Sequence, residues 1–514
     1  MSTDRAAIIG AGIGGLASAI ALARAGYAVT VLERAATAGG KMREIVVDGA
    51  PIDAGPTVLT MRWVFDALFE TAGQRLEDYV ALQPISILAR HAWSNNARLD
   101  LFADEAASAD AIGAFASAED ARGYLNFCAE ARRMYETLRE PFLSASKPNP
   151  ITLTSRIGLG RIGDLFAIRP FDTMWSALRV HFRDQRLRQL FGRYATYCGS
   201  SPFKAPATLM LIAHVEQEGV WIIKGGMQRL ADALAVCAEK LGVTFRFNAD
   251  VTQIETSQGR VSGVKLHNGE RIDANAVICN ADPGALAAGL FGADATPAVT
   301  NTGAKRSLSA VTWAVKSKTK GFPLVRHNVF FSDDYAAEFE TLENSLPSDP
   351  TIYMCAQDRD DLGQTDGPER QLILANAPAH TDARPFTPAE LDACETNMLN
   401  RLRRCGLEIA PTAMARTTPM DFSALFPATG GALYGRPTHG WMASFQRPGS
   451  RTNIPGLYLA GGGVHPGAGV PMAALSGQLA AQSILADRVS TPRSRVAVTR
   501  GGTSTRSAMT NSTA

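Results

Sequence analysis

The chain carries near its start the stretch Ala6-Ala-Ile-Ile-Gly10-Ala-Gly12-Ile-Gly14-Gly15, in which apolar residues lead directly into a glycine-rich loop. Residues 16–26 are rich in alanine and end in glycine, which is typical of a helix with a glycine C-terminal cap. Residues 27–32 alternate as a strand does and are followed by Glu33. The order strand, G-x-G-x-x-G, helix, strand and acid is the dinucleotide-binding fingerprint in its required context. The stretch therefore predicts an α/β fold with a Rossmann-like domain.

Each position of the fingerprint has a predicted task at a bound nucleotide. Gly10 allows the tight turn, Gly12 the approach of a pyrophosphate, and Gly15 the close packing of the helix. Gly14 belongs to the same loop, and we expect it at the cofactor as well. Glu33 can accept hydrogen bonds from the adenosine ribose. The alternative is a tight turn in an α/β protein that binds no nucleotide.

A second glycine-rich loop lies almost the whole chain away, within Pro455-Gly-Leu-Tyr-Leu-Ala-Gly-Gly-Gly-Val-His-Pro-Gly-Ala-Gly-Val-Pro-Met-Ala-Ala-Leu-Ser-Gly477. The pattern predicts a buried strand, a loop that allows backbone to approach a flat ligand, and a helix of small residues. Free N–H groups at the start of that helix favour an anion. We predict cofactor contacts from Gly462, Gly463 and Val470.

The residues after Glu33 favour FAD over NAD. They contain a glycine pair followed by two bases, Gly39-Gly40-Lys41-Met42-Arg43. A simple NAD domain has no need of these residues, whereas FAD extends past the pyrophosphate toward its isoalloxazine ring. We therefore predict cofactor contacts from Gly40, Lys41 and Arg43.

Together these segments resemble the amine oxidase and carotenoid desaturase group of FAD flavoproteins, over residues 6–486. In that group the late glycine loop lies beside the flavin, and a residue near Val251 contacts the adenine through its backbone. The run His465-Pro-Gly-Ala-Gly-Val-Pro471 looks like the signature of bacterial carotenoid desaturases. The resemblance implies a Rossmann-like FAD-binding domain interwoven with an α+β substrate domain.

Residues 53–63, 88–93 and 193–202 are similar to the branch that acts on hydroxylated acyclic carotenoids. The most similar family is that of the 1-hydroxycarotenoid 3,4-desaturases, or methoxyneurosporene dehydrogenases. Gly463-Val464 stands where phytoene desaturases usually have glycine-threonine. The resemblance implies FAD-dependent desaturation of acyclic 1-hydroxycarotenoids, such as 1-hydroxyneurosporene, at the C3–C4 bond in carotenoid biosynthesis.

Four other functions stay open. A phytoene desaturase shares the fold and chemistry, and a carotenoid isomerase would carry FAD without net oxidation. An amine oxidase would need an aromatic cage beside the flavin, which the loop at residues 462–466 does not supply. A non-catalytic carotenoid-binding flavoprotein is the alternative from a different class.

Desaturation removes a hydride, which the flavin accepts, and a proton, which needs only a modest base. The candidate catalytic residues are His465, Arg43 and Arg447, with Asp53 as a further polar residue. Each also has a structural interpretation: Arg43 neutralises phosphate, Asp53 is a turn acid, and His465 fixes its loop. The predicted substrate-binding residues are Tyr434 and His439 for the hydroxyl, and Trp441 and Phe445 for the polyene, although this aromatic run also suits a packed core.

Two units are expected, because 514 residues exceed the usual size of one compact domain. Pro388 to Arg404 has the pattern of a helix in the second unit, with Thr387 as its N-terminal cap. The predicted FAD-binding domain comprises residues 1–85, 219–288 and 446–486, the substrate domain 86–218 and 289–445, and a disordered basic tail 487–514.

Composition narrows the remaining possibilities. The 51 basic and 49 acidic residues give a net charge of +2, so no nucleic-acid partner is expected. Seven scattered cysteines indicate reduced core residues in a cytoplasmic protein, and no spacing suggests a metal site. We expect neither a signal peptide nor a membrane-spanning helix. Nothing in the sequence indicates an oligomeric state.

The expected substrate nevertheless requires a membrane, since an acyclic carotenoid has no useful solubility in water. Residues 161–179 interleave arginines, including Arg161, Arg169 and Arg179, with large apolar side chains. That mixture favours peripheral contact with the inner or photosynthetic membrane. A buried helix with a solvated basic face is the alternative.

Overall fold

The computed structural model describes residues 4–158, 160, 163, 168–299, 305–359 and 367–490. Its first sheet has five parallel strands in the order β19-β13-β1-β2-β9, with the N-terminal strand at the centre. Parallel strands need crossover connections, which is why residues from both ends of the chain meet here. The bounds are β1 (Arg5–Ile9), β2 (Ala28–Leu32), β9 (Thr244–Arg246), β13 (Ala276–Cys279) and β19 (Leu457–Leu459).

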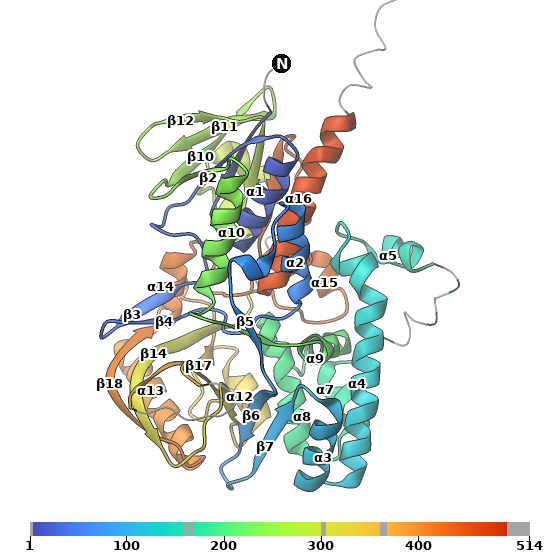
Figure 1. The fold of residues 1–514 in the computed structure, drawn as a ribbon, viewed down its shortest axis with the longest axis vertical. Coiled ribbons are helices and arrows are strands. Elements are labelled where there is room, and N and C mark those ends of the chain that lie inside the picture. The colour runs from blue at the N-terminus through green and yellow to red at the C-terminus, as the bar shows by residue number, and fades with distance from the viewer. Residues whose placement is uncertain are drawn as a thin grey trace, which may run out of the picture.

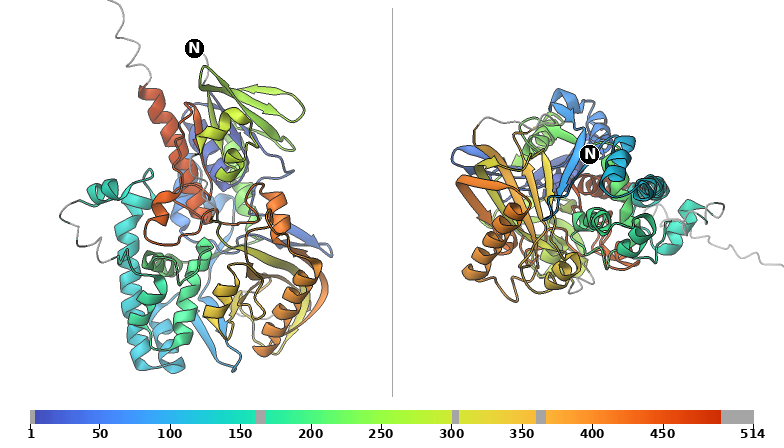
Figure 2. Two further views of the ribbon diagram at one scale, coloured as in Figure 1. Left: turned by 180° about the vertical axis from the view of Figure 1, so that it is seen from behind. Right: turned by 90° about the horizontal axis from the view of Figure 1, so that it is seen from below.

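The first and last helices of this unit pack directly on each other. They run side by side in Figures 1 and 2, as α1 (Ile13–Arg24) and α16 (Val470–Ser490). The Ser18 hydroxyl lies 2.7 Å from the Gly14 carbonyl and 3.1 Å from that of Gly477. A Cβ on Gly477 would lie 2.1 Å from the Gly14 oxygen, so only glycine allows this approach. Two more helices, α2 (Arg62–Thr71) and α10 (Gln228–Lys240), pack against α1, and α2 also contacts α16.

A second sheet has seven strands in the order β18-β14-β17-β16-β15-β6-β7. Helix α13 (Pro388–Arg404) packs on it through Leu391, Met398 and Leu402. This confirms the predicted helix, and Thr387 caps it in a reciprocal capping box with Glu390. The strand bounds are β6 (Ile87–Ala92), β7 (Arg98–Phe102), β14 (Ser309–Lys320), β15 (His327–Phe330), β16 (Ile352–Ala356), β17 (Glu369–Ala377) and β18 (Glu408–Thr417).

Between β7 and β8 (Trp221–Ile223) the chain is mainly helical. These helices stand beside the seven-stranded sheet at the lower right of Figure 1. The longest, α4 (Ala118–Leu138), buries Tyr124, Phe127 and Tyr135 along one face, as the three- and four-residue spacing of a buried stripe requires. The others are α3 (Glu105–Phe115), α5 (Pro150–Ile157), α7 (Met174–His181), α8 (Gln185–Gly192), α9 (Leu211–Gln217) and the 3₁₀ segment Arg193–Cys198.

Smaller elements complete the two units. A three-stranded antiparallel sheet, β10-β11-β12, stands at the top of Figure 1, and the hairpin β3-β4 and the two-stranded sheet β5-β8 lie lower down. The bounds are β3 (Glu44–Val47), β4 (Ala50–Asp53), β5 (Leu82–Pro84), β8 (Trp221–Ile223), β10 (Val251–Ser257), β11 (Arg260–Leu266), β12 (Arg271–Asp273), α11 (Pro283–Ala287), α12 (Tyr335–Thr341), α14 (Pro419–Leu425) and α15 (Ala443–Gln446).

This architecture confirms the predicted fold class: a Rossmann-like parallel sheet joined to a mixed α+β unit. The exact domain boundaries stay a prediction, supported by the way in which each sheet collects strands from distant parts of the chain. Residues 491–514, most of the predicted tail, lie outside the described residues.

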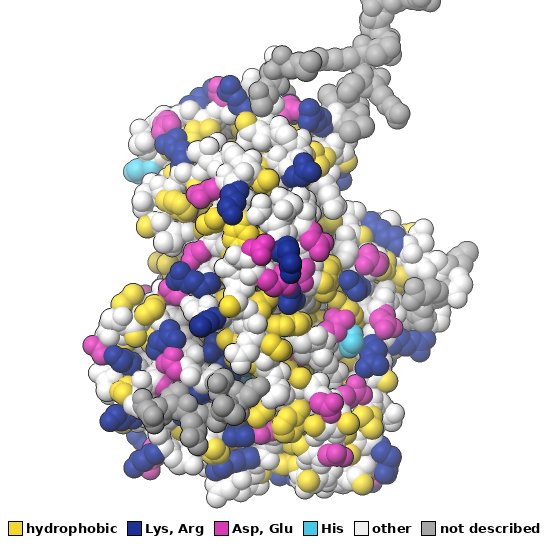
Figure 3. Space-filling view, viewed as in Figure 1, with side chains coloured by type: hydrophobic (Ala, Val, Ile, Leu, Met, Phe, Trp, Pro, Cys, Tyr) yellow, Lys and Arg dark blue, Asp and Glu magenta, His cyan; other side chains and the backbone are white. Residues whose placement is uncertain are grey.

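The distribution of charged residues and cysteines agrees with the near-neutral net charge and with reduced core cysteines. Basic and acidic side chains are interspersed on the face in Figure 3. All seven cysteines are free, and all except Cys198 are buried. Among the described residues, no helix is long and apolar enough to cross a bilayer.

Candidate functional site

A cavity of about 1180 Å³ extends between the parallel sheet and the seven-stranded sheet. One part is walled by the two glycine-rich loops, and another by largely apolar residues of α4, α9, β14 and β17. Its volume exceeds the roughly 300–1,000 Å³ of usual small-ligand pockets. The cavity therefore has room for a large cofactor together with part of a substrate. Of the predicted cofactor contacts, those that line it are Gly10, Gly12, Gly14, Glu33, Gly40, Lys41, Arg43, Val251, Gly462, Gly463 and Val470.

The fingerprint loop forms a backbone cradle at one wall of the cavity. Gly12 pairs with Gly39 in an isolated bridge, and a Cβ on Gly40 would lie 3.2 Å from the Gly12 Cα. Gly12 is also the N-cap of α1, and no side chain caps that helix. The free N–H groups there suit a pyrophosphate. Gly15 lies behind the loop instead, where a Cβ would be 2.1 Å from the Gly10 oxygen, so it serves packing.

Glu33 is fixed at the end of β2 by backbone donors. The Ala11 N–H donates to one carboxylate oxygen at 2.6 Å, and the Ala35 N–H donates to the other at 2.9 Å. The carboxylate lines the cavity, as does Val251 at the start of β10. A carboxylate retains lone pairs beyond these two bonds, so it can also accept from a ribose hydroxyl.

Asn280, which the sequence reasoning did not select, joins the two glycine loops. Its amide donates to the Gly10 carbonyl at 3.3 Å. Its oxygen would meet a Cβ on Gly14 at 2.6 Å and one on Gly461 at 3.0 Å. Its position directly after β13, at the carboxyl edge of a predicted parallel sheet, was the signal that could have identified it.

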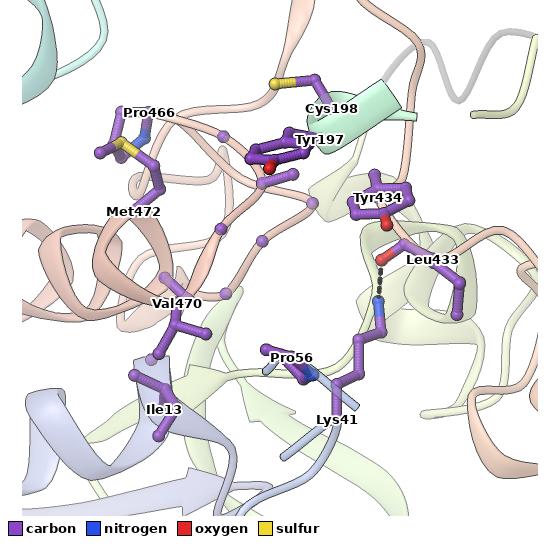
Figure 4. Close-up of a pocket in the computed structure, with 18 of the residues that line it drawn as sticks. Ile13, Lys41, Pro56, Tyr197, Cys198, Leu433, Tyr434, Pro466, Val470 and Met472 are labelled. Carbon is purple, nitrogen blue, oxygen red and sulfur yellow. Dashed lines mark hydrogen bonds between the residues drawn. The ribbon is translucent and has the colours of Figure 1, made fainter. Parts of the chain in front are cut away.

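Lys41 and Arg43 both reach the cavity wall. The Lys41 ammonium donates to the Leu433 carbonyl at 2.6 Å, as Figure 4 shows. Burial lowers the pKa of Lys41, and the nearby Asp282 carboxylate partly opposes this shift. Arg43 donates to the Thr417 hydroxyl at 3.3 Å. Both cations can therefore sit opposite the negative charge of a bound cofactor.

Arg447 holds loops together. Its guanidinium donates to the carbonyls of Tyr434 at 3.0 Å, Gly462 at 3.1 Å and Arg436 at 2.7 Å. A guanidinium has no lone pair with which to accept a proton. The arrangement favours a positioning role for Arg447, in which it ties the 434–436 segment to the late glycine loop, over a role as catalytic base.

His465 and Asp53 are not among the residues that line the cavity, which favours the structural interpretation of both over a catalytic role. The His465 Nε2 lies 2.9 Å from the Phe142 carbonyl and 3.0 Å from that of Ala145, and burial lowers the pKa of His465 to about 4. The Asp53 carboxylate accepts the Met227 N–H at 2.9 Å, at the start of α10. Both residues hold segments in place, because distant backbone partners orient their side chains.

Of the predicted substrate residues, Tyr434, Trp441 and Phe445 line the cavity, whereas His439 does not. The His439 Nε2 accepts the Ser201 N–H at 3.1 Å, and burial lowers the pKa of His439 to about 4. A neutral ring held in this way supports the chain rather than a substrate hydroxyl. The predicted contact between His439 and the hydroxyl is therefore replaced below.

Comparison with known proteins agrees with this geometry. Residues 13–485 match the flavin containing amine oxidoreductase family. The chain is 52% identical to hydroxyneurosporene desaturase from Rubrivivax gelatinosus, over 99% of this chain and 98% of the relative. It is 46% identical to hydroxyneurosporene desaturase from Cereibacter sphaeroides, over 95% and 98%. A structure of putrescine oxidase bound to putrescine shares the fold, with a TM-score of 0.62, 17% identity, and coverage of 94% of this chain and 99% of that one.

The chain belongs to the flavin containing amine oxidoreductase family. Within it, the chain groups with the carotenoid desaturases, so the predicted family is confirmed. The residues present fit FAD, the cofactor of this family: an uncapped helix N-terminus and glycine cradle suit its pyrophosphate, and Glu33 suits its ribose.

Proposed function

We propose that this enzyme desaturates acyclic 1-hydroxycarotenoids, such as 1-hydroxyneurosporene, at the C3–C4 bond with FAD. The observation that carries the proposal is one cavity whose lining joins the two glycine-rich loops to a largely apolar wall. Two relatives that cover nearly the whole chain are hydroxyneurosporene desaturases, which supports this substrate class. Phytoene desaturation is the second candidate, because an apolar channel also suits an unhydroxylated polyene.

The residues of the chain would position the substrate and exclude water. Bound FAD supplies the acceptor for the hydride that leaves the substrate. Apolar surface for the polyene comes from Leu372, Leu374 and Val215. The Phe445 ring packs edge-on against that of Phe142, with 5.9 Å between the ring centroids. Such walls keep the reacting edge dry and aligned. Tyr434 stands at the same wall as Leu433 in Figure 4, where it can contact the substrate near the cofactor.

Product analysis tests the reaction class. Enzyme, FAD and liposome-held 1-hydroxyneurosporene should give a product about two mass units lighter, since a hydride and a proton leave together, with its absorbance shifted to the red. A product of unchanged mass would instead identify an isomerase. Recovery of unchanged substrate from a flavin-loaded protein would point to a carrier.

We further propose that the enzyme collects its substrate from a membrane surface through an apolar rim of Ile151, Phe171 and Trp441. Their exposed fractions are 82%, 72% and 47%. Phe171 and Trp441 line the cavity, and their rings pack edge to face with 5.6 Å between the ring centroids. Ile151 belongs to α5, whose Pro150 and Leu153 line the cavity as well. Exposed aromatic residues at a cavity opening suit an interfacial contact.

The structure changes the basic part of this proposal. Arg169 forms an ion pair with Asp172 at 2.6 Å, so its charge is already compensated. Arg161 lies outside the described residues. Arg179 is exposed on α7 next to the exposed Val180. Apolar insertion is therefore expected to contribute more than electrostatic attraction.

The double substitution Ile151→Ser/Phe171→Ser should weaken binding to neutral liposomes by about a hundredfold or more, because each inserted apolar side chain contributes roughly 1.5–3 kcal/mol and two are removed. Co-sedimentation with liposomes measures this. Val46→Ser is a matched control, since Val46 is 69% exposed and is not among the residues that line the cavity. Equal losses in both proteins, or full binding by the double variant, would contradict the proposed rim.

A further inference from the structure

A buried polar cluster interrupts the apolar wall of the cavity. Arg193, Tyr197 and Glu216 all line the cavity, and the first and last are only 8% and 7% exposed. The Arg193 guanidinium donates to the Tyr197 hydroxyl at 3.0 Å. That hydroxyl donates to the Glu216 carboxylate at 2.7 Å. Burying these charges in a channel for a hydrocarbon is costly, so their presence calls for a ligand that uses them.

The hydrogen bonding of this cluster is incomplete. The Glu216 carboxylate accepts from Tyr197 and, at its other oxygen, from Tyr194 at 2.7 Å. The Arg193 Nε is buried and has no hydrogen-bond partner among the described residues. A buried, unsatisfied donor is unfavourable by roughly 1–3 kcal/mol or more when charged. A ligand oxygen in the cavity would restore a balanced network.

An alcohol fits this environment better than other groups. The alcohol oxygen can accept a hydrogen bond from the Arg193 guanidinium. The alcohol O–H can donate a hydrogen bond to the Glu216 carboxylate or to the Tyr197 phenol oxygen. A carboxylate ligand would meet Glu216 with a like charge, and an ammonium would meet Arg193 likewise. The chemistry of the cluster therefore selects a neutral hydroxyl.

The cluster also lies where the reacting end of the substrate belongs. Figure 4 shows Tyr197 on the same side of the cavity as Tyr434, across the open space from Ile13, Pro56 and Lys41. In a 1-hydroxycarotenoid the oxygen is three bonds from C3, so it lies within roughly 4 Å of the reacting bond at bond lengths of about 1.5 Å. A residue that binds this hydroxyl must therefore stand near the cofactor. Gly199, two residues after Tyr197, packs against the Tyr434 ring, and Arg447 joins the Tyr434 carbonyl to that of Gly462 in the late glycine loop.

We infer that Arg193, Tyr197 and Glu216 bind the C1 hydroxyl of the substrate and thereby set which bond lies at the cofactor. This inference rests on the proposed function and replaces the role first expected of His439. The long polyene would extend away from the cluster, toward the opening marked by Phe171 and Trp441. Specificity then follows from the cluster, because a substrate without the oxygen leaves Arg193 and Glu216 unsatisfied.

Two tyrosines provide a matched test. Tyr197→Phe and Tyr194→Phe each remove one hydroxyl that donates to Glu216 at 2.7 Å, but Tyr194 does not line the cavity. The measured quantity is the ratio of kcat/KM for 1-hydroxyneurosporene to that for neurosporene, which is independent of the folded fraction. Dissociation constants of both carotenoids, from quenching of tryptophan fluorescence, provide the same ratio without turnover.

Tyr197→Phe should lower this preference by about tenfold or more, the effect of losing a hydrogen bond within a charged network. Tyr194→Phe should lower it clearly less than Tyr197→Phe does, because Tyr194 supports Glu216 but does not line the cavity and makes no contact with the substrate. Arg193→Lys should also lower it, since lysine keeps the charge but not the fork of donors. If Tyr197→Phe and Arg193→Lys both keep the wild-type preference for 1-hydroxyneurosporene, the inferred role of the cluster is wrong, whereas the proposed function still stands. A wild-type enzyme that desaturates neither carotenoid would instead contradict the proposed function.

Discussion

Gly12→Val should yield a folded protein that binds FAD about a hundredfold more weakly, as expected if overpacking of the cofactor cradle costs roughly 3 kcal/mol. Even the first added carbon would lie 2.8 Å from the Asn280 amide nitrogen. The rest of the side chain would occupy the cradle beside Gly39 and Gly40. Flavin absorbance of the purified protein and titration of the apoprotein with FAD measure the loss.

The control for this variant is a substitution at a glycine that has room for a Cβ and lies outside the cofactor loops. Gly113 lies inside α3, and a Cβ there would make only ordinary contact with Ala121 at 3.5 Å. Gly113→Ala should therefore keep its flavin. Glu33→Ala should fall between the two, at about one to two orders of magnitude, because a hydrogen bond to a charged group contributes roughly 1.5–3 kcal/mol. Full flavin content in Gly12→Val and Glu33→Ala would show that the cofactor lies elsewhere.

The backbone of the cofactor site could be predicted from the sequence because its signals are local. The loop at Gly10 and the late loop each contain their own strand, glycines and helix, and β1 and β19 form as the patterns indicate. The same holds for α13, whose cap Thr387 and partner Glu390 are three residues apart. Where the decisive contacts are close in sequence, residue order suffices.

Side-chain direction depends on distant partners and could not be predicted. His465 turns toward carbonyls more than 300 residues earlier in the chain, and His439 toward Ser201. The cluster of Arg193 and Glu216 forms only when the 3₁₀ segment and α9 meet at the cavity. In each case a contact between residues far apart in the sequence determines whether a polar side chain faces the cavity or the protein interior.

The second large effect concerns substrate choice. We expect kcat/KM for 1-hydroxyneurosporene to exceed that for phytoene by at least about a hundredfold, because a site that hydrogen-bonds a hydroxyl strongly rejects analogues without it. The buried Arg193 and Glu216 are the groups that phytoene would leave unpaired. Initial rates with each carotenoid in the same liposomes measure the ratio.

A competition between these two substrates tests the proposed substrate choice most directly. One liposome preparation carries 1-hydroxyneurosporene and phytoene in equal amounts, and the products are separated and characterised by mass, absorbance and NMR. We expect the hydroxylated carotenoid to be consumed first and to gain its new double bond at C3–C4. Consumption of phytoene at an equal or higher rate, or a new double bond elsewhere in the hydroxylated product, would contradict this proposal.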